Sequence, residues 1–311
     1  MFKYVIRRLL LMIPILFGVI LITFTLFNLF GGDPAGQAAG KYATAERIEE
    51  LRHELGMDKS IPLQLIDYIK QVVTFDFGRS WFTKQQISQM ILDGAGPSLS
   101  LTLPGFFLAQ LISISLALLV AYWRHTLFDR GMMFFCLAML SLSSLVYILF
   151  FQYALAYEAD LFPISGWDSS WLGRWNFLAL PILIFVVISL GSNVLFFRTV
   201  FLDELFQDYV RTARSKGVPE KRVLFKHILR NAMIPIITLV VYQMPFLIVG
   251  SLLIESFFGI PGLGGLIYQA IQNADFPVIK AMTLIGALLY MFFQLLSDIL
   301  YAVVDPKVQL K

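Results

Sequence analysis

The chain has 311 residues, of which 58% are hydrophobic and only 14% are charged, and its mean hydropathy is +0.75. A typical soluble domain is about 45–50% apolar and about 25% charged, so this composition excludes an ordinary soluble protein and indicates an integral membrane protein. The formal net charge is only +3, and the single cysteine, Cys136, excludes an intramolecular disulfide.

Six apolar runs are long enough to cross a membrane, which takes roughly 20 residues. The first run exceeds the roughly 7–15 apolar residues of a signal-peptide core, so we expect it to remain as a span. The sequence therefore predicts an all-α membrane protein with six transmembrane helices. They are expected at about Leu9–Phe30, Ser98–Trp123, Gly131–Tyr157, Phe177–Phe197, Met233–Glu255 and Ala281–Val304.

Between the first two spans, residues 31–97 form a polar segment rather than another span. Within it, TAERIEELRHELG begins with Thr44 as a candidate N-cap, places Ile48, Leu51 and Leu55 on one face, and ends at Gly56. We expect a small extracytoplasmic segment that lies on the bundle. The predicted organisation is an N-terminal span (1–30), this segment (31–97) and the main transmembrane domain (98–311).

The distribution of charge predicts the orientation. Fifteen of the 24 Lys/Arg residues lie at the termini or in the loops after the second and fourth spans, whereas 14 of the 21 acids lie on the other side. Positively charged loops remain cytoplasmic. Both termini are therefore expected in the cytoplasm.

The loop before the fifth span carries the densest positive charge. DYVRTARSKGVPEKRVLFKHILRNAMIP holds seven Lys/Arg and two acids. It predicts two helices, the first at about Asp203–Lys216, joined at Gly217, which suits a left-handed C-cap, and Pro219, which suits a first helical turn. The hairpin is expected within residues 203–232. Its apolar stripes are Phe206, Tyr209, Val210 and Ala213 on the first helix and Val223, Leu224 and Ile228 on the second.

Physical chemistry alone leaves two uses for such a hairpin. A basic amphipathic helix can lie at lipid headgroups, or it can dock into a groove of a cytoplasmic partner. Nucleic-acid binding is not expected, because no matching motif accompanies the basic run.

At this point the chain resembles a known family. DYVRTARSKGVPEKRVLFKHILRNAMIPIIT resembles the coupling-helix motif of ABC-importer permeases of the dipeptide, oligopeptide and nickel branch. The resemblance extends through FNLFGGDP after the first span, LGMDKSIPLQLIDYI and FDFGRSW in the extracytoplasmic segment, ESFFGIPGLGGLI, and the last span with its DPK tail. Of the general importer motif only Ala213, Gly217 and Leu229 match, while the peptide-branch form matches throughout Tyr209–Gly217.

The resemblance implies an ABC type I importer permease fold that translocates di- or oligopeptides across the bacterial cytoplasmic (inner) membrane. Nickel or a peptide antibiotic remain alternative cargoes. The expected partners are two cytoplasmic ABC ATPase subunits, a second homologous permease, an extracytoplasmic peptide-binding protein and membrane lipid. The residues expected to couple to the ATPase are Tyr209, Val210, Arg211, Thr212, Ala213, Arg214, Lys216 and Gly217.

We expect no catalytic, cofactor or metal site in this chain. The nearest approach to a phosphate-binding loop, AGQAAGKY, has Ala35 in place of the first glycine and Tyr42 in place of Ser/Thr. ATP and magnesium are accordingly expected in the partner ATPase subunits, and this chain is not expected to be an enzyme. His53, His125 and His227 share no ligand spacing.

The rival class is an ion-coupled secondary carrier or a channel, which usually places ionisable residues at mid-membrane. Asp298 is the one clear candidate, and it has no evident partner within its own span. One departure from the family is that SLSSLVYILF lacks the proline of the kink at the start of the third span. This departure predicts a different geometry for the pathway.

Overall fold

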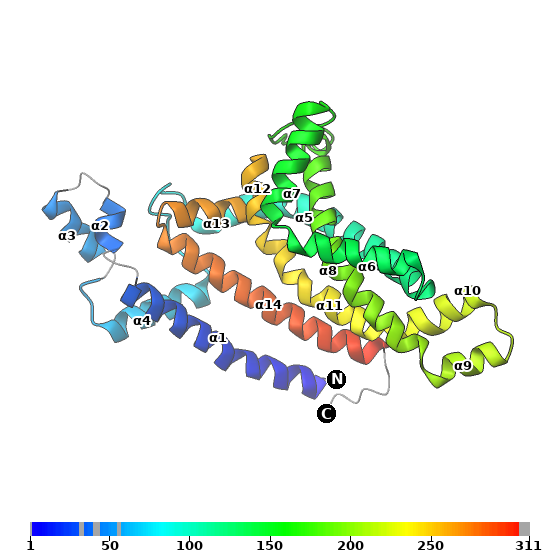
Figure 1. The fold of residues 1–311 in the computed structure, drawn as a ribbon. Helices are drawn as coiled ribbons and strands as arrows, with labels where there is room; N and C mark the ends of the chain where they lie inside the picture. Colours follow the sequence, from blue (N-terminus) through cyan, green and yellow to red (C-terminus); the bar gives the residue numbers. More distant parts are fainter. Residues whose placement is uncertain (1, 31–33, 40–43, 55–56, 305–311) are drawn as a thin grey trace.

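The structure is a computed structural model, and it describes residues 2–30, 34–39, 44–54 and 57–304. Helices run side by side along one long axis (Figure 1). No strand occurs in these ranges; the extended pairing consists of one isolated bridge between Arg79 and Gln86. The predicted all-α fold is therefore confirmed.

Within the described ranges, five helices or helix runs are long and apolar enough to cross a membrane, and two bent helix pairs raise the number to seven if each counts as a span. The six predicted spans fall inside this interval. The spanning helices are α1 (Phe2–Phe30), α5 (Ile87–Tyr122), α8 (Arg174–Leu205), α11 (Leu229–Val249) with the turns that precede it, and α14 (Phe276–Val304).

The third predicted span is bent rather than straight. α6 (Leu127–Ser141) meets the continuous run of α7 (Ser144–Phe151) and η1 (Gln152–Glu158) at an angle of 96°. The chain bends here although it lacks the proline that the family carries at the start of this span. The expected difference in pathway geometry stays a prediction.

Side chains hold this bend in place of a proline ring. The Ser143 hydroxyl caps α7 by accepting a hydrogen bond from the backbone N–H of Leu145, at 3.4 Å. The Tyr147 hydroxyl donates to the carbonyl of Met139 at 2.8 Å. That carbonyl lies in the last turn of α6, where helix carbonyls need partners from outside the helix.

The fifth predicted span ends earlier than expected. α11 stops at Val249 with Pro235 and Pro245 inside it, and the chain breaks at Gly250. Two short helices follow, α12 (Leu252–Phe258) and α13 (Leu263–Gln272), at 88° to each other. The predicted continuation to Glu255 is therefore wrong, since that residue belongs to α12.

The segment between the first two spans forms short helices at one end of the bundle (Figure 1). These are α2 (Pro34–Ala39), α3 (Ala45–Glu54) and α4 (Ile61–Thr74). Thr44 accepts a hydrogen bond from Arg47 N at 3.3 Å, which confirms it as the N-cap. Three sequence features lie outside the described residues in whole or in part: residues 31–33 of the GGDP exit (31–34), Gly56, and the DPK tail (305–307).

Three buried clusters make up the core. One lies between α5, α8 and the turns before α11, a second between α7, α8 and α12, and a third joins α1, α4, α13 and α14. The first cluster continues into the basic loop between α8 and α11. This shared cluster fixes the basic loop to the ends of α8 and α11.

Candidate functional site

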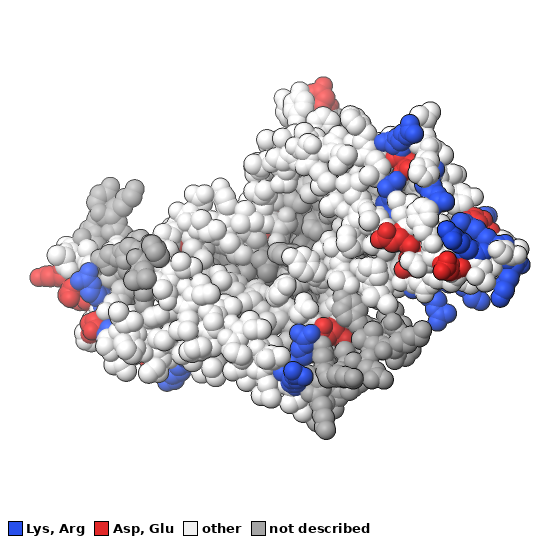
Figure 2. All heavy atoms as spheres, turned by 60° about the horizontal axis from the view of Figure 1, so that its bottom comes forward, with Lys and Arg blue, Asp and Glu red and all other residues white. Residues whose placement is uncertain are grey.

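The basic loop forms a hairpin that projects from the end of the bundle, and we call residues 208–228 the basic hairpin. It consists of α9 (Asp208–Ser215), α10 (Glu220–Arg222) and η2 (Val223–Ile228). Figure 1 shows it extending beyond the other helices, and Figure 2 shows Lys and Arg gathered at that end, while most of the visible surface elsewhere is uncharged. The basic hairpin is thus separate from the largely uncharged surface of the spanning helices (Figure 2).

The hairpin turns at Gly217, as the sequence predicts. Gly217 has a φ of +74°, and its N–H bonds the Arg214 carbonyl at 2.9 Å, while the Val218 N–H bonds the Ala213 carbonyl at 3.2 Å. These two bonds are those of a Schellman cap, which favours glycine at the left-handed position. A Cβ at Gly217 would meet no atom of the described residues within 4 Å, so the backbone conformation is the reason for glycine here. Pro219 follows as the N-cap of α10.

The first helix of the hairpin is shorter than predicted. α8 continues through Asp203 and Glu204 to Leu205, and the chain breaks at Phe206–Gln207 before α9 begins. The two acids therefore end a span rather than begin the hairpin, and the predicted start at Asp203 is wrong. Phe206, predicted to lie in the apolar stripe, is 57% exposed.

The remaining stripe is buried inside the protein itself. Val210 and Ala213 of α9 pack with Val223, Leu224 and Ile228 in the same core cluster as Phe201 of α8. Both stripe residues therefore stabilise the hairpin and fix it to α8. Ala213 packs inside the hairpin, and its predicted role in coupling to an ATPase stays a prediction.

The other predicted coupling residues form the outer surface of the hairpin. Arg211, Thr212, Arg214, Lys216 and Gly217 are exposed. Arg214 is held by Glu220, with Nη2 2.5 Å from Oε1 and Nε 3.2 Å from Oε2. This two-point pairing fixes the guanidinium across the turn.

Tyr209 joins the hairpin to the end of α8. It is half-buried, and its hydroxyl donates a short hydrogen bond to the Glu204 carboxylate. Burial, reinforced by that carboxylate, raises the pKa of Tyr209 to about 12. The phenol consequently keeps its proton and remains a donor at neutral pH.

Beneath the hairpin, a buried ion pair ties α6 to α8, and the sequence reading missed it. Arg198 Nε and Nη2 lie 2.7 and 2.9 Å from the two carboxylate oxygens of Asp129, which also accepts from the His125 N–H at 2.9 Å. The Arg124 guanidinium lies 4.6 Å from the centre of the Phe206 ring. Asp129 follows a helix-start signal at Thr126, but no local pattern names a partner 69 residues away.

At the opposite end of the molecule, Glu255 organises the α12–α13 pair. Its side chain is fully buried and accepts from Ser98 Oγ at 2.8 Å, Ser251 N at 3.0 Å and Gly265 N at 3.1 Å. The Leu263 N–H in turn donates to Ser98 Oγ at 2.7 Å. The sequence prediction placed Glu255 at the end of the fifth span and did not include these contacts.

Amide side chains link three spans inside the bundle. Gln110 of α5 donates to Gln243 of α11 at 2.7 Å, and Gln243 donates to Asn193 of α8 at 3.1 Å. Because each amide stands alone in its own apolar run, no local pattern indicates that the three side chains meet.

Asp298, the candidate for a proton relay, has a partner on another span. Its Oδ2 lies 3.1 Å from Arg8 Nη2 of α1. This ion pair joins α1 to α14, and the sequence did not predict it.

Comparison with known proteins agrees with this arrangement. A family model described as "Binding-protein-dependent transport system inner membrane component" matches residues 113–310, and the model for the N-terminal part of such components matches residues 1–102. The chain is 35% identical over 311 residues to the glutathione transport system permease protein GsiC of Shigella flexneri serotype 5b (strain 8401), of Escherichia coli (strain K12) and of Salmonella typhi, with 100% of both chains covered in each case. The chain therefore belongs to the inner-membrane components of binding-protein-dependent transport systems, and it is an ABC-importer permease of the dipeptide, oligopeptide and nickel branch.

Proposed function

We propose that this permease carries peptides, di- or oligopeptides in size, into the cell, and that its basic hairpin is the element that two cytoplasmic ATPase subunits move. The observation that carries the cargo proposal is the full-length similarity to permeases named for glutathione, which is itself a tripeptide. A second homologous permease and an extracytoplasmic binding protein complete the transporter. The hairpin and both termini face the cytoplasm.

The construction of the hairpin supports the coupling role. Its inner face is fixed to α8 by Val210 and Ala213, and its second helix continues through η2 into α11. A displacement of the hairpin is therefore transmitted to two spans at once. The exposed residues Arg211, Thr212 and Lys216 supply the polar surface that a partner contacts.

The cargo is tested by reconstitution. The permease pair, its ATPases and its binding protein are placed in liposomes, and uptake of labelled glutathione, a dipeptide and Ni²⁺ is measured with and without ATP. We expect ATP-dependent accumulation of at least one peptide and none of Ni²⁺. Uptake of Ni²⁺ alone would exclude the peptide assignment while leaving the importer class intact.

Gly217→Leu tests the coupling role. A leucine in the left-handed conformation costs about 1–2 kcal/mol, which shifts an equilibrium by a factor of about 5–30. We expect transport to fall by a similar factor while the amount of protein in the membrane stays unchanged. Gly217→Asn is the matched control, because asparagine tolerates this conformation and should retain most of the transport.

Transport by Gly217→Leu at the wild-type rate would contradict the coupling role. The same variants also report on assembly. Co-purification from native membranes, followed by mass spectrometry, should recover ATPase subunits with the wild-type chain and with Gly217→Asn, and fewer with Gly217→Leu.

A further inference from the structure

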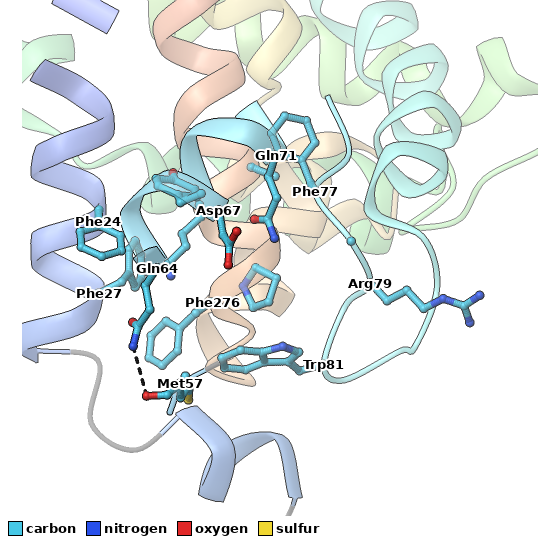
Figure 3. Close-up of a pocket in the computed structure, with 15 residues that line it drawn as sticks. Phe24, Phe27, Met57, Gln64, Asp67, Gln71, Phe77, Arg79, Trp81 and Phe276 are labelled. Atoms are coloured by element: carbon cyan, nitrogen blue, oxygen red, sulfur yellow. Dashed lines mark hydrogen bonds between the residues drawn. The ribbon is translucent and has the colours of Figure 1, made fainter. Parts of the chain in front are cut away.

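A cavity of about 220 Å³ lies at the end of the bundle opposite the basic hairpin, where α1, α4 and α14 meet (Figure 3). Aromatic rings form much of its wall. Figure 3 shows Phe24 and Phe27 projecting from α1, with Phe276 and Trp81 below them. The importer mechanism proposed above makes no use of this cavity.

The cavity contains a cation with no acidic partner. Lys280 lines it, and its ammonium lies 5.3 Å from the centre of the Phe27 ring and 5.6 Å from that of Tyr68. Within the described part of the chain, no carboxylate forms an ion pair with Lys280. Asp67 also lines the cavity, but its carboxylate forms an ion pair with Lys59 Nζ at 2.6 Å.

A second hydrogen-bonding group in the wall is unused. Tyr68 is only 8% exposed, and its hydroxyl has no hydrogen-bond partner among the residues that the structure describes. Burial raises the pKa of Tyr68 to about 12, so the hydroxyl keeps its proton and can donate. Buried polar groups are nearly always satisfied, and an ammonium beside a free hydroxyl is an arrangement that suits an anion.

The depth of the cavity favours a lipid as the source of that anion. The apolar span in α1 ends at Phe27 and the one in α14 begins at Phe276, and both residues line the cavity. It therefore lies at the level where aromatic side chains gather at the membrane surface.

The helix α4 also indicates that the cavity lies at the membrane surface. One of its faces packs on α1 through Tyr68, while Ile61, Ile66 and Val73 are 67%, 58% and 72% exposed. Exposed apolar side chains on a short amphipathic helix at this depth indicate a helix that lies in the membrane interface. The cavity thus opens beside lipid headgroups.

We propose that this cavity binds the phosphodiester group of a membrane phospholipid, with the Lys280 ammonium and the Tyr68 hydroxyl as its donors. The lipid would strengthen the packing of α1 on α14 and α4. Its role would be to hold the N-terminal span in place.

Native mass spectrometry tests the proposal on the transporter purified from its own membranes, by measuring the phospholipid retained after detergent exchange. Loss of a charge-assisted hydrogen bond should lower retention by about tenfold in Lys280→Gln. Tyr68→Phe removes only one oxygen and should lower retention a few-fold while leaving folding intact. Lys70→Gln, which removes an exposed charge of α4 outside the cavity, should retain lipid like the wild type.

Equal retention in Lys280→Gln, Tyr68→Phe and Lys70→Gln would overturn the proposal, as would a wild-type protein that retains no lipid. Soluble sn-glycerol 3-phosphate distinguishes the source of the anion. If it displaces the lipid at millimolar concentration, the site binds a free phosphate ester and the lipid assignment fails. Loss of peptide transport with retention unchanged would concern the proposed function and not this site.

Discussion

Glu255→Leu is expected to destabilise the permease strongly. The substitution leaves the buried Ser98 hydroxyl and the N–H groups of Ser251 and Gly265 without their acceptor, and each stranded donor costs about 1–3 kcal/mol. At roughly 2–4 °C per kcal/mol for a chain of this order, the melting temperature should fall by about 10 °C. The melting temperature is measured by thermal unfolding of the purified protein, monitored by intrinsic fluorescence.

Glu255→Gln is the matched control. Oε1 accepts from both Ser98 and Ser251, so an amide oxygen in that place keeps two of the three bonds, and only the Gly265 N–H then faces a nitrogen. About half of the loss should be recovered. A Glu255→Leu protein that melts at the wild-type temperature would show that the acid does not hold α12 and α13 together.

Gly264→Ala is expected to open the contact between α12 and α13. A Cβ at Gly264 would lie 2.6 Å from Leu252 N and 2.8 Å from Ser251 C. Both are backbone atoms, which cannot move aside as a side chain can. Overpacking of this kind costs about 1–3 kcal/mol, and it should shorten the half-life of the detergent-solubilised protein at elevated temperature.

Gly265→Ala provides the comparison. Its Cβ would approach the Ile260 carbonyl oxygen no closer than 3.4 Å, an ordinary contact. Both substitutions gain the same helix preference of alanine over glycine, about 1 kcal/mol, so the difference between the two half-lives isolates the steric effect. Equal half-lives would mean that the backbone of α12 can move away without cost.

The spans were predictable because lipid requires long apolar helices, whatever the tertiary arrangement. Their breaks were not. The apolar residues from Phe206 to Ala213 keep helical spacing through the break at Gln207. Periodicity therefore cannot show that α8 ends there and α9 begins. Gly217 was predictable because its requirement is local, namely a left-handed cap that few residues adopt.

Contacts between segments far apart in the sequence were the main feature that the sequence did not predict. The role of the predicted coupling residues stays a prediction, and an apolar stripe does not state whether it faces a partner or its own chain. Val210 and Ala213 pack against their own chain. Asp129 with Arg198, and Asp298 with Arg8, are pairs formed between different helices. Such pairs depend on which helices become neighbours, and a single sequence does not contain that information.

The bend between α6 and α7 has a consequence for its stability. A proline there would remove one backbone N–H permanently, whereas Leu142, Ser143 and Ser144 each keep theirs, so every donor needed for a continuous helix is present. The bent form is favoured by the Ser143 cap and the Tyr147 hydroxyl, each worth about 1 kcal/mol. The bend is therefore held by two separable hydrogen bonds and not by a covalent ring, so substitution of Ser143 or Tyr147 alone would weaken it.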